Sequence, residues 1–136
     1  MIKIVFKNLS KALQSVRNTY LRLAGISIGK DTFISWGAKL DISGKGKITI
    51  GERCEITHGC VIVSHDAAVK RIDPKGQRWG SVKIGNNVFI GVNSVVLFDV
   101  AIGDNSVIGA GSVVTKDIPS NVVAVGNPAK VIKTLS

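Results

Sequence analysis

The chain has 136 residues, the size of a single domain, and 45% of them are hydrophobic, which is enough to form a core. No run of 18 apolar residues occurs, so no segment is predicted to span a membrane. The opening MIKIVFKNLSK lacks the long apolar core of a secretion signal, so the expected location is cytoplasmic.

The formal net charge of +9 raises the question of nucleic-acid binding. The chain has no recognised nucleic-acid motif and no basic run with interleaved aromatic residues, so no nucleic-acid partner is expected. Acidic small molecules or an anionic membrane surface explain the charge with fewer assumptions.

Residues 3–23 are predicted to form an amphipathic helix, and residues 1–25 an N-terminal unit. Its apolar residues recur at three- and four-residue spacing and share one face: Phe6, Leu9, Leu13, Val16, Tyr20 and Leu23. Basic residues fill other positions, and the first acidic residue is Asp31. The helix is interpreted as a cap over the open end of a solenoid. A basic segment lying on an anionic membrane, at the inner membrane face, is compatible with that role.

From Ile28 onward an aliphatic residue returns at every sixth position, most regularly in residues 84–119. The repeated positions there are Ile84, Ile90, Val96, Ile102, Ile108 and Val114. A hexapeptide period is typical of a parallel β-helix, in which three hexads make one triangular coil. IGNNV at 84 should therefore stack on IGDNS at 102, with the aliphatic side chains pointing inward.

Two insertions interrupt the period. The interval from Ile28 to Ile50 is one coil plus four residues, which predicts a small outward loop at SGKGK. The interval from Ile50 to Ile84 is one coil plus sixteen, which predicts a long loop over residues 65–82. Long excursions from a regular scaffold are usually functional. After the last hexad we expect one more strand around residues 122–125 and a tail that packs back along the outside of the coils.

The two cysteines, Cys54 and Cys60, are six residues apart and occupy equivalent small-residue positions. They are expected to be buried at corners of the coils. A disulfide or a metal-binding pair is the less favoured alternative. Neither cysteine suggests an oxidising compartment.

The hexads and the ending VGNPAKVIK resemble the hexapeptide-repeat acyltransferases, which include galactoside, maltose, serine and xenobiotic acetyltransferases. The resemblance covers residues 26–133 and implies an all-β solenoid, a left-handed parallel β-helix over residues 26–136. The handedness comes from the resemblance alone, because ordinary parallel crossovers are right-handed. The resemblance also implies acetyl-CoA as the acyl donor and a homotrimer of parallel prisms with active sites between subunits.

His65 is the candidate general base. Acyl transfer to an alcohol or amine needs a group that takes the acceptor's proton, and neutral imidazole suits this task near pH 7. His65 stands where the inward pattern stops and the long loop begins, and the resembling family carries its catalytic histidine there. Asp66 follows directly and is a candidate to orient the imidazole, although a solvated turn residue is the plainer interpretation. His58 is expected to be structural or to contact substrate.

A zinc enzyme is the rival chemistry on this fold, because gamma-class carbonic anhydrases bind zinc through three histidines. Zinc catalysis needs three protein ligands and an open position. The chain has two histidines, so no metal is expected.

The resemblance to galactoside-type acetyltransferases assigns donor contacts residue by residue. Val92 and Ala110 match positions whose backbone meets the pantetheine arm, and Phe89 falls where several relatives carry tryptophan. The nucleotide half and its phosphates would be met by Thr115, Lys116, Lys130 and Lys133. At the last two positions relatives often have arginine, and lysine keeps the charge but lacks the bidentate fork.

The acceptor is predicted to be a hydroxyl of a sugar or polysaccharide precursor, because short relatives commonly accompany bacterial surface-polysaccharide synthesis. The galactoside and maltose enzymes hold the sugar with an asparagine in the coil before the catalytic one, and the matching stretch FISWGAKLDI has none. Candidate acceptor contacts are Trp36, His58, Asp66 and Trp79. Tryptophan offers a flat apolar platform for a sugar ring. An N-acetyltransferase acting on an amino sugar or xenobiotic and a non-catalytic assembly platform are the alternatives.

Overall fold

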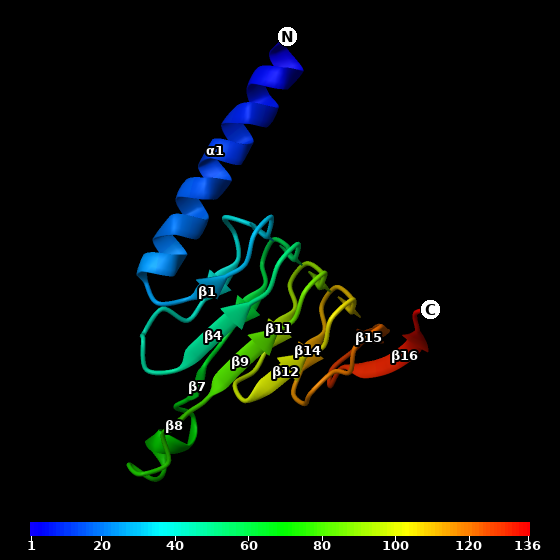
Figure 1. Cartoon of the computed structure of the whole chain (residues 1–136). Helices are drawn as coiled ribbons and strands as arrows, with labels where there is room; N and C mark the ends of the chain where they lie inside the picture. Colours follow the sequence, from blue (N-terminus) through cyan, green and yellow to red (C-terminus); the bar gives the residue numbers. More distant parts are fainter.

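The computed structural model describes the whole chain, residues 1–136, as one long helix followed by a three-sided prism of short parallel strands (Figure 1). Successive strands fall in turn on the first, second and third side of the prism. Each side is therefore a sheet whose neighbouring strands belong to neighbouring coils.

The first sheet contains β1 (Ser27–Ile28), β4 (Lys47–Ile50), β9 (Ser81–Ile84) and β12 (Val100–Ile102). The second contains β2 (Phe33–Ile34), β5 (Glu55–Ile56), β10 (Phe89–Ile90), β13 (Val107–Ile108), β15 (Val122–Val125) and β16 (Lys130–Thr134). The third contains β3 (Lys39–Leu40), β6 (Val61–Ile62), β11 (Val95–Val96) and β14 (Val113–Val114). A separate antiparallel pair joins β7 (His65–Asp66) to β8 (Arg78–Trp79), and a short 3₁₀ helix spans Val69–Arg71.

The predicted hexapeptide register is confirmed. Ile84 pairs with Ile102 across one coil, and the six repeated aliphatic side chains of residues 84–119 are at most 2% exposed. Ile28 pairs with Ile50, and Ile50 with Ile84, so both insertions leave the prism as loops. A thin core of aliphatic side chains therefore runs along the prism axis.

Left-handed backbone makes a sharp turn in every coil where the first sheet leads into the second. The residues there have φ between 53° and 60°: Asp31, Arg53, Asn87, Asn105 and Asn121. Asparagine and aspartate tolerate this conformation better than most residues. The Asn87 amide donates to Oδ1 of Asn105 at 2.9 Å, and the Asn105 amide to Oδ1 of Asn121 at 3.1 Å. This ladder of amides joins the upper coils at that corner.

Helix α1 (Ile2–Leu23) confirms the predicted N-terminal helix. It lies against the first coil, where it contacts β1 and β2, and its N-terminal half extends past the strands (Figure 1). No helix of the protein combines the length and apolar content needed to cross a bilayer.

The C-terminal tail differs from the prediction. The last predicted strand is present as β15, but the chain then reverses and β16 pairs antiparallel with it. The tail thus extends the second sheet beyond the final coil instead of running along the outside of the coils. The physical reason is that the last strand of a sheet has an unpaired edge, and β16 supplies hydrogen-bond partners for it.

Both cysteines are free and buried, as predicted. Their thiols contact carbonyl oxygens of the next coil: Cys54 Sγ lies 3.0 Å from the Gly85 oxygen, and Cys60 Sγ lies 3.2 Å from that of Gly91. Burial raises the pKa of the Cys54 thiol. The two residues therefore act as small packing groups.

Candidate active site

The long loop leaves the prism at one corner, where the third sheet leads into the first. This His65 corner consists of residues 41–46, 63–80, 97–99 and 115–117. The loop is closed at its base by the bond from Gly80 N–H to the Ser64 carbonyl at 2.9 Å and by the pairing of β7 with β8. His65 is thus the first loop residue after the regular coil, which is the position predicted for it.

The imidazole of His65 is paired with a carboxylate from the coil below. Nδ1 of His65 lies 2.5 Å from Oδ2 of Asp41. The same Asp41 oxygen accepts the hydroxyl of Ser64 at 2.8 Å, and its other oxygen accepts the Ser43 N–H at 2.9 Å. The Asp41 side chain is only 9% exposed, whereas that of His65 is 32% exposed. Asp41 is therefore held in one orientation, and the imidazole remains accessible.

These contacts keep Asp41 ionised. Burial by itself would raise its pKa, but the bonds donated by the Ser43 backbone, His65, the Ser43 side chain and Ser64 outweigh burial and hold the pKa well below its usual range. An ionised carboxylate only accepts hydrogen bonds, so the proton of the contact belongs to Nδ1 of His65. In the neutral ring Nε2 is then the free acceptor, which is the tautomer a general base requires.

Trp79 forms one wall beside this pair. It is directly opposite His65 in the β7–β8 pair, and the two rings lie 5.0 Å apart between centroids with 37° between their planes. The ammonium of Lys45, from the small loop of the coil below, lies 5.2 Å from the Trp79 ring centroid. Both insertions therefore converge on His65, the long one through Trp79 and the short one through Lys45.

Asp66, the candidate nearest in sequence, is paired elsewhere. Its carboxylate accepts the Ala68 N–H at 2.9 Å and a guanidinium N–H of Arg78 at 3.1 Å. These two bonds lower the pKa of Asp66. The carboxylate hydrogen-bonded to His65 is Asp41, which sequence reasoning missed, and Asp66 instead ties the two strands at the loop base together.

Four other predicted residues lie at a different corner, where the second sheet leads into the third: Trp36, His58, Val92 and Ala110. His58 is exposed and packs over Gly37, because a Cβ at that glycine would overlap its ring. Trp36 is 58% exposed, with the guanidinium of Arg17 at 5.4 Å from its ring centroid. On one chain these residues are separated from His65 by a full side of the prism, about 15 Å at the usual rise per strand residue.

The remaining donor candidates lie at the His65 corner and on strands of the second sheet. Thr115 and Lys116 are at the His65 corner, two coils above His65. Phe89 is on the outside of β10, and register aligns it with Val107, Val123 and Lys133 across the second sheet. None of the three lysines predicted to contact the donor takes part in a salt bridge: Lys116 at the nucleotide half, and Lys130 and Lys133 at the phosphates.

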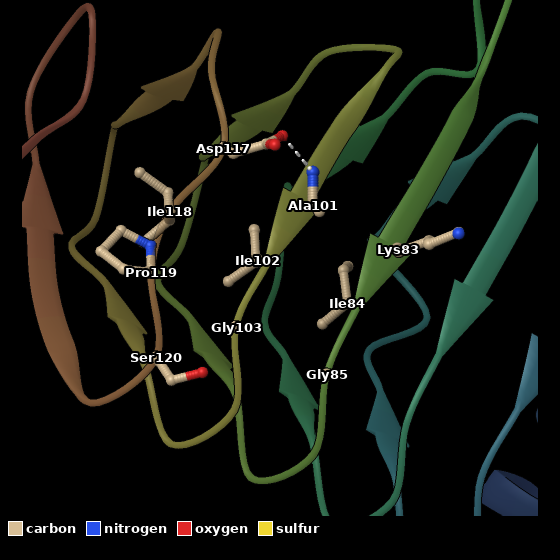
Figure 2. A pocket seen from close by; sticks show the side chains of 10 residues that line it. All are labelled: Lys83, Ile84, Gly85, Ala101, Ile102, Gly103, Asp117, Ile118, Pro119 and Ser120. Carbon is tan, nitrogen blue, oxygen red and sulfur yellow. Dashed lines mark hydrogen bonds between the residues drawn. The ribbon is translucent and has the colours of Figure 1, made fainter.

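A shallow groove of about 480 Å³ lies on the outer surface of the first sheet (Figure 2). Its floor crosses three coils, and the Asp117 carboxylate in its wall accepts the Ala101 N–H at 2.8 Å. A smaller hollow that shares Lys83, Ala101 and Asp117 continues it toward Ser81, two residues beyond Trp79. None of the predicted site residues lines either hollow, so the hollows reach the His65 corner at Asp99 and Asp117 but do not include His65.

Comparison with known proteins identifies the same hexapeptide repeat. The profile of a family described as "Hexapeptide repeat of succinyl-transferase" matches residues 81–116. The chain is 42% identical to Protein CapG of Staphylococcus aureus over 138 residues, which cover 98% of this chain and 76% of that protein.

Two solved structures share the fold at 40% and 29% sequence identity. A maltose O-acetyltransferase from Clostridium difficile 630 superposes with a TM-score of 0.73 at 40% identity, covering 82% of this chain and 59% of that one. The hexapeptide-repeat containing acetyltransferase VCA0836 from Vibrio cholerae O1 biovar eltor, complexed with acetyl coenzyme A, superposes with a TM-score of 0.73 at 29% identity. That match covers 82% of this chain and 61% of the other. The chain thus spans about three fifths of the length of these two proteins.

The stacked hexads and these comparisons define an acyltransferase of the hexapeptide-repeat class. The chain belongs to the hexapeptide-repeat acyltransferase family.

Proposed function

We propose that the protein is an acetyl-CoA-dependent O-acetyltransferase that transfers an acetyl group to a hydroxyl of a sugar or polysaccharide precursor. The observation that carries the proposal is the His65–Asp41 pair at the root of the long loop, with Nδ1 bound to the carboxylate and Nε2 free. We also propose that the β-helix of this chain is left-handed, as the resemblance to the hexapeptide-repeat acyltransferases implies.

His65 acts as the general base. Nε2 accepts the proton of the acceptor hydroxyl as its oxygen attacks the acyl carbon, and His65 returns that proton to the departing sulfur. Asp41 keeps Nδ1 protonated and stabilises the positive charge that the imidazole acquires. Acetyl-CoA, when bound, supplies the acetyl group as a thioester.

The donor is assigned to residues that fit its charge and shape. Lys116, Lys130 and Lys133 are exposed and free of carboxylate partners, as phosphate contacts should be. The Ala110–Gly111 corner is open, since a Cβ at Gly111 would meet no other atom, so an extended pantetheine arm can approach the backbone of Val92 and Ala110 there. The acetyl coenzyme A complex of the VCA0836 acetyltransferase supports the same donor for this chain.

The active site is proposed to form between two copies of the chain in a homotrimer. His65 and the Val92–Ala110 corner are on different corners of one prism, so a single chain does not bring base and pantetheine site together. Cyclic packing of flat-sided prisms places the His65 corner of one copy against a different corner of the next. We expect a particle of three 14.4 kDa chains.

The acceptor is proposed to be a sugar because Trp79 stands beside His65 and presents an exposed ring, and because a maltose O-acetyltransferase is among the similar structures. An aromatic face suits the apolar side of a pyranose ring. Trp36 and His58 are further acceptor contacts, supplied from their own corner.

The test is product analysis. Purified protein is incubated with acetyl-CoA and matched acceptors, a neutral hexose, its 2-amino analogue and an oligosaccharide, and the products are identified by mass spectrometry and NMR. O-acetylated sugar supports the proposal. Acetylation confined to the amino group would reassign the enzyme as an N-acetyltransferase, and failure to bind coenzyme A in calorimetry would favour the assembly platform.

A further inference from the structure

Helix α1 uses its polar side, not its apolar side, to contact the prism. The Asn18 amide donates to the Thr32 carbonyl at 2.8 Å, and the Gln14 amide to the Ile34 carbonyl at 3.1 Å. The Arg17 guanidinium donates to the Ala38 carbonyl at 2.7 Å, and that of Arg22 to the Ile28 carbonyl. These side chains supply donors to the open edge of the first coil, whose strand carbonyls have no further coil to pair with. The cap is therefore a polar one.

The apolar side of α1 is left uncovered as a result. Its residues follow three- and four-residue spacing, and between 47% and 65% of each is exposed: Val5, Phe6, Leu9, Leu13, Val16 and Tyr20. Only Asn18 and Leu21 of the whole helix are buried. Figure 1 shows the helix running obliquely away from the prism, so no other part of this chain covers the apolar stripe.

The stripe continues onto the first coil. A hollow beside the helix is lined by Tyr20 together with Trp36 and Ile42, which are 58% and 46% exposed. Tyrosine and tryptophan are the side chains enriched where proteins meet the boundary between lipid and water. A contiguous apolar surface of this extent on a folded protein marks a site of association.

The charge of the N-terminal segment indicates which kind of partner covers the apolar stripe. Residues 1–30 contain six of the 18 lysine and arginine residues and none of the nine acidic residues. A second copy of this chain, itself at a formal net charge of +9, would add positive charge instead of offsetting it. Anionic lipid headgroups supply the missing negative charge, and the acyl boundary accepts the apolar stripe.

We propose that the stripe of α1, with Tyr20 at its end, docks the protein on an anionic lipid bilayer, with the helix lying along the surface and the prism held above it. This surface is distinct from the His65 corner, and the inference does not depend on the proposed reaction. It extends that function by placing the active site close to a membrane surface.

The test is flotation of the full-length protein with two kinds of vesicle, one of phosphatidylcholine alone and one that also contains 30 mol% phosphatidylglycerol. The buffer contains about 0.1 M NaCl, at which electrostatic interactions extend over about 10 Å. The substituted residue is Phe6 and the matched control is Ile4. Both are 65% exposed, but Ile4 lies on the opposite side of the helix. Phe6→Asp and Ile4→Asp make the same charge change two residues apart, so they differ mainly in the face they alter.

We expect the wild type to float only with the anionic vesicles. Phe6→Asp should lower the bound-to-free ratio by about tenfold or more, Ile4→Asp should stay within about threefold of wild type, and 1 M NaCl should release the protein. Absence of wild-type binding to anionic vesicles, or equal loss in both variants, would overturn the proposal. A change of particle mass in Phe6→Asp, with no vesicle binding by the wild type, would assign the stripe to contacts between copies instead. Acetyl transfer to a soluble acceptor should be unchanged in Phe6→Asp, which separates a failure of docking from a failure of the enzymatic proposal.

Discussion

Replacing Asp41 with asparagine isolates the carboxylate charge behind His65. Asparagine has nearly the same shape and keeps an oxygen that can accept the Nδ1 proton, so the ring is still supported. The negative charge is removed from a side chain that is 9% exposed and 2.5 Å from the imidazole. The positive charge that His65 acquires during proton transfer then loses its partner.

The structure gives the expected size of the effect. A charge-assisted hydrogen bond of this kind contributes about 1.5–3 kcal/mol, and each 1.36 kcal/mol corresponds to about a tenfold change in rate. We therefore expect Asp41→Asn to lower kcat by about 10- to 150-fold while KM for acetyl-CoA changes by less than about threefold. Initial rates of thiol release from acetyl-CoA, measured with saturating acceptor, report both constants.

Asp99→Asn is the matched control. Asp99 is at the same corner, one coil beyond His65 and two beyond Asp41, and its carboxylate accepts the Ser81 N–H at 3.1 Å but contacts no histidine. The Asp99→Asn variant tests whether loss of any carboxylate at this corner disturbs the loop, and the kcat of this variant should stay within about threefold of wild type. The reasoning is refuted if Asp41→Asn also stays within that range, or if Asp99→Asn falls as far as Asp41→Asn.

Three further predictions concern stability and donor binding. Because the pKa of Asp41 is lowered from its ordinary 3.8, its contribution to stability is complete above that value and is lost as the pH falls through the folded-state value. The difference in unfolding free energy between wild type and Asp41→Asn, from urea titrations, should thus shrink as the pH falls below about 3.8; a difference that stays the same or grows below that pH would contradict this. Ile90→Ala, at a fully buried position, should cost about 2–5 kcal/mol, and Ile132→Ala, at a position 64% exposed, less than about 0.5 kcal/mol; equal costs in denaturant titrations would argue against the packed core. Lys133→Ala should raise KM for acetyl-CoA about 5- to 20-fold with kcat nearly unchanged, and a variant with wild-type KM would remove this lysine from the donor site.

The repeat itself was readable from the sequence because its signal is local. Each coil needs one inward aliphatic residue per side, so the period appears directly in the chain, and the two insertions appear as departures from it. The pairings of Ile28 with Ile50 and of Ile50 with Ile84 follow from counting residues alone. The position of His65 at the root of the loop follows in the same way.

Side-chain contacts between coils were harder to predict from the sequence. Asp41 is 24 residues before His65, whereas Asp66 is its immediate neighbour, and proximity in sequence brought only Asp66 into consideration. The signal was present: one coil plus the four inserted residues of SGKGK places Leu40 beside Ile62, and hence Asp41 beside Val63 and close to His65. Register corrected for the insertion would have identified the pair.

The periodicity of the sequence does not predict which face of α1 contacts the prism. An amphipathic pattern identifies an apolar face but not what that face meets, and the usual expectation is that it faces the protein. Here the first coil presents unpaired carbonyl groups, which amide and guanidinium groups such as those of Asn18 and Arg17 satisfy better than aliphatic side chains do. The polar face therefore turns inward.

The most direct test of the central claim, that His65 takes the acceptor's proton, is acetyl-CoA turnover by wild type and His65→Ala against a panel of sugars and amines. Thiol release reports the rate, and calorimetric titration with coenzyme A checks that the variant retains its donor site. We expect wild-type turnover with at least one sugar hydroxyl, and a fall in kcat of about 10²-fold or more in His65→Ala with coenzyme A binding preserved. Turnover by His65→Ala within about threefold of wild type would contradict the assignment of His65 as the base.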